Sequence, residues 1–108
     1  MALDLVGLTL RVSIEGPDQD IFSKLPRELG LTTPRLDHIS ARFYEDPSLT
    51  PDQVPVLRDE LVSLRDAYRE KGRPPAPANA DLLGTLDRLI ALCEESIGAK
   101  KGIHAISD

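Results

Sequence analysis

Acidic side chains crowd into one stretch of this sequence, and they are the residues with the most obvious chemical use. The 108-residue chain has a net charge of −5. Residues 45–70 hold seven acids against three arginines, so most of the excess charge lies there. Carboxylates can bind Ca²⁺ or Mg²⁺, act as an acid–base pair, or form a surface for a basic partner.

The spacing of these acids does not favour a metal loop. An EF-hand places acids at alternate positions, with a central glycine and a closing glutamate. Here Asp46 is followed by "PSLTP" before Asp52 provides the next acid. His38 and His104 are expected on different strands that could be neighbours, but two histidines without a third clear ligand make a poor zinc site. We therefore expect no metal and no cofactor.

No catalytic constellation is apparent in the sequence. The adjacent acids Asp59 and Glu60, like Glu94 and Glu95, face different directions on a helix and cannot share a proton. Apolar residues flank Cys93 at helical spacing, which favours a buried, unreactive thiol. The glycines form no phosphate-binding loop. We expect a protein that is not an enzyme, with a small enzyme or metal protein built from the histidines and acids as the least favoured alternative.

Composition also bears on location and partners. The single cysteine excludes an internal disulfide, and the first residues lack the pattern of a signal peptide. No stretch approaches the roughly 20 apolar residues of a membrane span. These features predict a cytoplasmic protein without a membrane partner. An acidic chain with four aromatic residues also argues against a nucleic acid partner, while it suits a basic protein.

Three segments show the pattern of strands. Residues 8–15 alternate strictly between apolar and polar side chains, which is typical of a half-buried strand. Residues 36–44 alternate again, and a short apolar run follows Gly102 near the end of the chain. In the first segment the side chains expected to point into the core are Leu8, Leu10, Val12 and Ile14.

Two helices are expected on either side of the acidic stretch. The first covers residues 18–30, with Asp18 as N-cap, a break near Leu25 caused by Pro26, and an end at Gly30. The other begins after Asn79, carries a leucine-rich face and ends at Gly98. A proline-rich linker, residues 72–78, precedes it and is too short to separate domains.

The middle helix has the clearest start signal in the chain. Thr50 is expected to cap it, with Gln53 reaching back in a capping box and Leu49 packing against Val54 as a hydrophobic staple. Pro55 leaves two alternatives, a tightened and kinked first turn or a regular helix that starts at Pro55 after a capped turn. The expected core-facing seam consists of Val54, Leu57, Leu61, Leu64 and Tyr68.

These segments predict a single α+β domain over residues 1–108. The order is strand, helix, strand, helix, helix, strand. We expect a three-stranded sheet with a pair of antiparallel helices packed on one face, because a small sheet must bury its apolar side against other elements.

The second half of the chain resembles small bacterial proteins of immunity or uncharacterised type. The resemblance covers about residues 36–108 and is carried by "FYEDPSLTPDQVPVLRDELVSL", "LLGTLDRLIALCEES" and "GIHAISD". Immunity proteins neutralise toxins that are delivered between competing bacterial cells. The resemblance implies a protein partner, although the toxin, its activity and the contact residues do not carry over.

We therefore expect a binding protein that neutralises a basic toxin through its acidic surface. Tyr44 would be an aromatic anchor, because aromatic residues dominate many interfaces. An alternative is a homo-oligomeric module, such as a homodimer, that uses a strand edge or the leucine seam. The candidate partner-binding residues are Tyr44, Glu45, Asp46, Asp59, Asp66 and Glu70.

Overall fold

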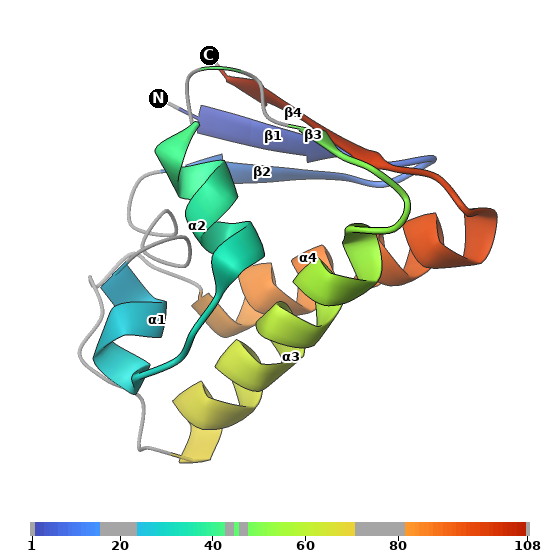
Figure 1. Cartoon of the computed structure of the whole chain (residues 1–108). Coiled ribbons are helices and arrows are strands. Elements are labelled where there is room, and N and C mark those ends of the chain that lie inside the picture. The colour runs from blue at the N-terminus through green and yellow to red at the C-terminus, as the bar shows by residue number, and fades with distance from the viewer. Residues whose placement is uncertain (1, 16–23, 43–44, 46–47, 71–81, 108) are drawn as a thin grey trace.

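The computed structural model describes residues 2–15, 24–42, 45, 48–70 and 82–107. They form an α+β fold in which the helices lie on one side of an antiparallel sheet (Figure 1). The elements are β1 (Ala2–Val6), β2 (Arg11–Glu15), α1 (Lys24–Leu29), α2 (Pro34–Ala41), β3 (Ser48–Leu49), α3 (Val54–Glu70), α4 (Leu82–Ala99) and β4 (Ile103–Ser107).

The sheet has four strands in the order β2-β1-β4-β3, and the expectation of three strands was wrong. Strands β1 and β3 were not foreseen. All the pairings are antiparallel, and Leu5 lies opposite both Val12 and Ala105. These three side chains are buried on the face toward the helices. The opposite face includes Asp4, whose carboxylate accepts hydrogen bonds from the side chains of Arg11 and Ser13.

The first expected strand is half strand and half turn. Only Arg11–Glu15 pairs in the sheet, because the chain reverses direction between β1 and β2. The N–H of Gly7 donates to the carbonyl of Leu10 at 3.0 Å and closes this turn. Leu8 and Leu10 are 57% and 40% exposed, so their expected place in the core was wrong. The alternating pattern continues into the turn, where it no longer indicates which side chains point toward the helices.

The expected strand over residues 36–44 was also wrong, because α2 occupies Pro34–Ala41. Leu36 and Ile39 are buried and three residues apart, which places them on one helix face. Pro34 is the first helical residue, where its missing N–H costs nothing. As a result His38 lies on a helix while His104 lies on β4, so the two are not sheet neighbours.

Helix α1 covers Lys24–Leu29, within the expected helix over residues 18–30, of which residues 18–23 lie outside the described residues. It ends before Gly30, whose φ of +71° suits a glycine. The described helix continues through Pro26, so the expected break near Leu25 was wrong. Leu25 and Leu29 are buried. The expected cap, Asp18, lies outside the described residues.

The start of α3 confirms the capping box in part. The backbone N–H of Thr50 donates to Oε1 of Gln53 at 3.1 Å, as the motif requires. Leu49 and Val54 are both buried, in keeping with the staple. The helix begins at Val54 after a turn over residues 51–53 and continues through Pro55, which agrees with a capped turn followed by a regular helix.

Helices α3 and α4 pack against each other and supply half of the buried apolar residues of the described core. Every residue of the expected seam, from Val54 to Tyr68, is buried. The seam therefore serves the core and does not offer a surface to a second chain. Helix α4 passes through Gly98 and ends at Ala99, so the expected end was one residue early. The linker 72–78 and Asn79 lie outside the described residues.

Among the described residues, neither long helix combines the length and apolar character that crossing a membrane requires.

Candidate functional site

Glu60 is a buried acid that links two helices. It extends from α3 and is only 8% exposed. Its Oε1 accepts the backbone N–H groups of Arg35 and Leu36, each at 3.0 Å, and its Oε2 also accepts the Arg35 N–H at 3.0 Å. These donors belong to the first turn of α2, where N–H groups have no partner within the helix. Thr33, the N-cap residue, makes no side-chain cap bond. Glu60 therefore takes over the capping of α2 from a distant part of the chain.

Two opposing effects act on the ionisation of Glu60. Burial raises the pKa of its carboxyl above the ordinary value, because a charge is poorly solvated away from water. The N–H groups of Leu36 and Arg35 favour the ionised form and limit this rise in pKa. A buried carboxylate with donors on one side is a strong acceptor for a further cationic group on the other side.

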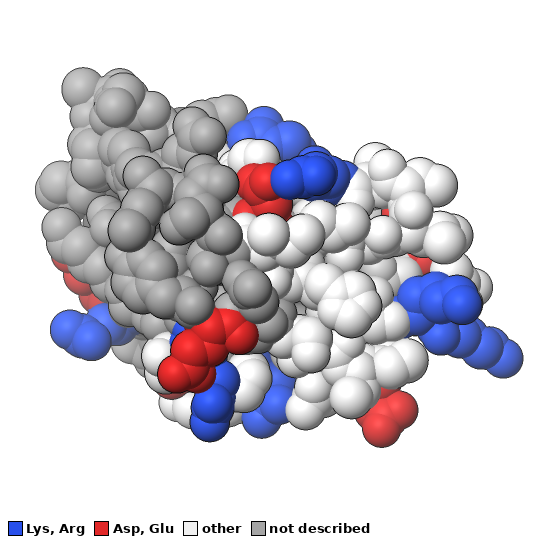
Figure 2. All heavy atoms as spheres, turned by 90° about the horizontal axis from the view of Figure 1, so that it is seen from above, with Lys and Arg blue, Asp and Glu red and all other residues white. Residues whose placement is uncertain are grey.

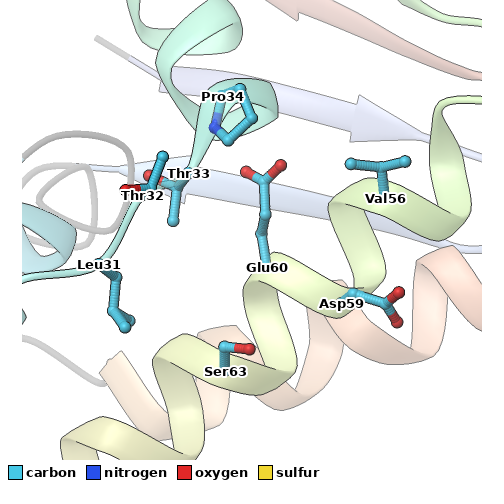
Figure 3. Close-up of a pocket in the computed structure, with 8 residues that line it drawn as sticks. All are labelled: Leu31, Thr32, Thr33, Pro34, Val56, Asp59, Glu60 and Ser63. Atoms are coloured by element: carbon cyan, nitrogen blue, oxygen red, sulfur yellow. The ribbon is translucent and has the colours of Figure 1, made fainter.

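A cavity of about 340 Å³ opens beside Glu60. We call it the α2–α3 cavity, since it lies between the start of α2, the segment before it, and α3. Figure 3 shows Glu60 projecting from α3 toward Pro34. The carboxylate of Asp59 points away from the Glu60 side chain. The residues that line the cavity are Leu31, Thr32, Thr33, Pro34, Val56, Asp59, Glu60 and Ser63.

The lining combines an apolar wall with acids. Val56 is 46% exposed and presents its apolar side chain to the cavity. Leu31 is partly buried against the core. Figure 3 shows Glu60 between these two residues. A carboxylate has about four acceptor positions, so bonds to two N–H groups leave it further capacity to accept. This arrangement suits an elongated group with an apolar stem and a positively charged end.

Of the four candidate residues that the structure describes, one lines this cavity. Asp59 lines it, and its side chain is 73% exposed and 3.0 Å from Arg58. Glu45 is exposed and forms an ion pair with Arg42 at 3.2 Å. Tyr44 and Asp46 lie outside the described residues.

The remaining two candidates lie further along α3. Glu70 is exposed at the end of the helix. Asp66 is 3.4 Å from Arg65, which also reaches Asp87 on α4 at 3.4 Å. Asp66 thus borders a set of charges that joins the two helices, and much of the expected negative potential there is balanced by arginine.

Sequence reasoning missed Glu60 because acids are usually exposed. A signal was nevertheless present. Glu60 follows Leu57 by three residues and precedes Leu64 by four, so helical spacing places it on the buried side of α3. An acid on that side needs a partner, and the N-terminus of another helix is one of the few that a buried carboxylate finds.

Other candidates for chemistry do not converge. Within the described ranges, no three His, Cys, Asp or Glu side chains are grouped so that they could hold a metal ion. Cys93 is buried, as expected, and burial raises the pKa of its thiol to about 12. A thiol with that pKa is protonated at neutral pH and is a weak nucleophile.

Comparison with known proteins gives no relative from which a role could be transferred. No protein-family model, curated protein or solved structure matches this chain.

Proposed function

We propose that this protein is a binding protein that docks a lysine or arginine side chain of a basic protein partner into the α2–α3 cavity. The observation that carries the proposal is the pairing of an apolar wall with the Glu60 carboxylate in one cavity. Lysine and arginine have the matching shape, since their aliphatic stems pack on apolar groups while their charged ends stay near polar ones.

The partner's side chain would lie with its stem against Leu31 and Val56 and its cation near Oε2 of Glu60. The N-terminus of α2 partly balances the charge on Glu60. Asp59, at the rim, adds a second and more exposed negative charge. Charges at a rim mainly raise the association rate and make it sensitive to salt.

An immunity protein is the class of binding protein that we favour. The net charge of −5 and the sequence resemblance over residues 36–108 support a basic toxin as the partner. Neutralisation would be steric and electrostatic, because a bound acidic protein covers a basic active-site rim and excludes the substrate. This mechanism needs no catalytic group on the present chain.

The site is testable before the partner is known. We would titrate the ¹⁵N-labelled chain with N-acetyl-arginine amide and N-acetyl-lysine amide, and with N-acetyl-norleucine amide as the neutral control. The amide signals of Thr33, Arg35 and Ser63 should shift with the cationic probes, with dissociation constants on the order of millimolar, since single side chains bind weakly. The norleucine probe should give much smaller shifts.

Two variants with the same change in charge locate the interaction. Asp59→Lys should abolish the shifts, whereas Asp66→Lys, on the same helix outside the cavity, should leave them nearly unchanged. If both variants lose the amide shifts equally, the probes respond to the net charge of α3 and do not bind in the cavity. A native pull-down with the same pair of variants then asks whether a protein partner depends on Asp59.

A further inference from the structure

Strand β2 forms one edge of the sheet, and the hydrogen-bond pattern shows which of its groups point outward. In an antiparallel pair, hydrogen-bonded and non-hydrogen-bonded residue pairs alternate. The bond from the Gly7 N–H to the Leu10 carbonyl marks one hydrogen-bonded pair. Following the register from there, Val12 and Ile14 bond to β1. The N–H and C=O groups of Arg11 and Ser13 therefore point away from β1.

Among the described residues, β1 is the only strand that pairs with β2. A small hollow of about 110 Å³ lies between this edge and α4. Leu10 and Val12 line it from the strand side, and Ala91 lines it from the helix. An edge strand with outward N–H and C=O groups is a template for pairing with another strand. Figure 2 looks onto the outer face of the sheet, and the described residues visible there are mainly uncharged, with charged groups at their margins.

We propose that β2 pairs with β2 of a second copy of this chain, antiparallel and with the two-fold axis at Ser13. The two sheets would then form one continuous sheet. Such an interface is isologous, so each strand offers the other the same residues in reverse order. Ser13 would face Ser13 of the other copy in a hydrogen-bonded pair, because its backbone groups point outward.

The order of residue types along β2 favours a second copy as the occupant. With the axis at Ser13, position 11 faces position 15, so an arginine lies opposite a glutamate at both ends of the interface. Val12 faces Ile14 on the helix side, and both are buried apolar residues. Opposite charges and β-branched residues in facing positions stabilise antiparallel pairs. An axis at Val12 would place Arg11 opposite Ser13 and lose both charge pairs.

This association is independent of the proposed function, because it uses none of the residues that line the α2–α3 cavity. Val56→Asp, a cavity variant, should leave self-association unchanged. The two sites can therefore be tested separately, and failure of one does not imply failure of the other.

The test compares Ser13→Pro with Ser13→Ala by sedimentation equilibrium. Both variants lose the hydroxyl that bonds Asp4, but only proline removes the outward N–H. The wild-type chain and Ser13→Ala should show the same monomer–dimer equilibrium. Ser13→Pro should raise the dissociation constant at least about tenfold. A wild-type chain that stays monomeric over about a hundredfold range of concentration would overturn the proposal. Equal dimerisation of the two folded variants would do the same.

Charge reversal provides a second test that does not depend on how proline is tolerated. Glu15→Arg places two arginines opposite each other and should weaken the dimer, and adding Arg11→Glu should restore it. Arg11 also bonds Asp4 within its own chain, so the double variant is checked for folding by circular dichroism. Weakening by Glu15→Arg without recovery in the folded double variant would contradict this register.

Discussion

Glu95 on α4 holds the turn between β1 and β2 through Thr9. Its Oε1 accepts the Thr9 N–H at 2.8 Å and the Leu10 N–H at 3.1 Å, and its Oε2 accepts the Thr9 hydroxyl. The two residues are 86 positions apart in the chain. A turn whose N–H groups bond to a carboxylate is fixed relative to the helix, and in this protein that contact ties β2 to α4.

We predict that Glu95→Gln lowers stability mainly above the ordinary pKa of glutamate. The hydroxyl and N–H of Thr9 lower the pKa of the Glu95 carboxyl in the folded state. A lowered pKa means that the ionised carboxylate favours folding above the unfolded pKa of about 4.3. This contribution is lost as pH falls through the folded pKa. Urea unfolding from about pH 3 to pH 6 should therefore show a weaker gain in stability for the variant than for the wild type. Glu94→Gln, a change at an exposed neighbour on the same helix, is the control for the loss of one negative charge and should lower stability less than Glu95→Gln does at pH 6.

Glu60 should show the opposite pH dependence. Burial raises the pKa of its carboxyl in the folded state, so the protonated form favours folding. That contribution is complete below about pH 4.3 and is lost as pH rises through the folded pKa. The side chain of the Glu60→Gln variant stays neutral at every pH. The free energy of unfolding of the variant should therefore rise relative to that of the wild type as pH rises. If the variant instead loses stability relative to the wild type as pH rises, the N–H groups of α2 lower the pKa of the Glu60 carboxyl by more than burial raises it.

Glu60→Ala tests the capping role at a fixed pH. It leaves the N–H groups of Arg35 and Leu36 without their acceptor, and unsatisfied buried donors cost about 1–3 kcal/mol. Chemical unfolding should show this loss, with Glu60→Gln losing less because its carbonyl oxygen still accepts. Hydrogen exchange at the Leu36 amide should become faster in the alanine variant. Unchanged exchange would show that Glu60 does not hold the start of α2.

Sequence reasoning succeeded where one helix carried its own signals. The seam and the cap of α3 follow from residue spacing and from "TPDQ", and both involve neighbours in the chain. It failed at α2, where the alternation of residues 38–43 favoured a strand over a helix. The pair Thr33-Pro34 resembles Thr50-Pro51 and was an available start signal.

The contacts that shape the candidate site could not be predicted from the spacing of residues within one segment. Glu60 reaches N–H groups 24 and 25 residues away in the chain, and no periodicity reports that distance. Strand β1 was missed because it has only five residues and ends in two adjacent apolar residues, Leu5 and Val6, and β3 has only two residues. Both strands depend on pairing with β4, which lies at the other end of the sequence.

The end of α4 predicts a stabilising substitution. The Lys101 N–H donates to the Ser96 carbonyl at 2.9 Å and the Lys100 N–H to the Ile97 carbonyl at 3.1 Å, which is the Schellman pattern. Lys100 occupies its left-handed position with a φ of +56°, where a side chain is strained. Lys100→Gly should raise the free energy of unfolding by about 1 kcal/mol. The control, Lys101→Gly, removes an equal charge outside the left-handed position and should not stabilise the protein.

Two glycines should respond in opposite ways to the same substitution. A Cβ at Gly102 would lie 2.2 Å from the Leu49 carbonyl oxygen, a backbone atom that cannot move without disturbing the pairing of β3 with β4. Gly102→Ala should therefore destabilise the protein by about 1–3 kcal/mol, as overpacking does. Gly98 lies inside α4, and apart from the helix's own backbone no atom of the described residues lies within 4 Å of an added Cβ. Gly98→Ala should stabilise by about 0.5–1 kcal/mol, because alanine restricts the unfolded chain and favours a helix. Thermal and urea unfolding of the two variants should move in opposite directions, and a stable Gly102→Ala protein would contradict the close approach of β3 to the start of β4.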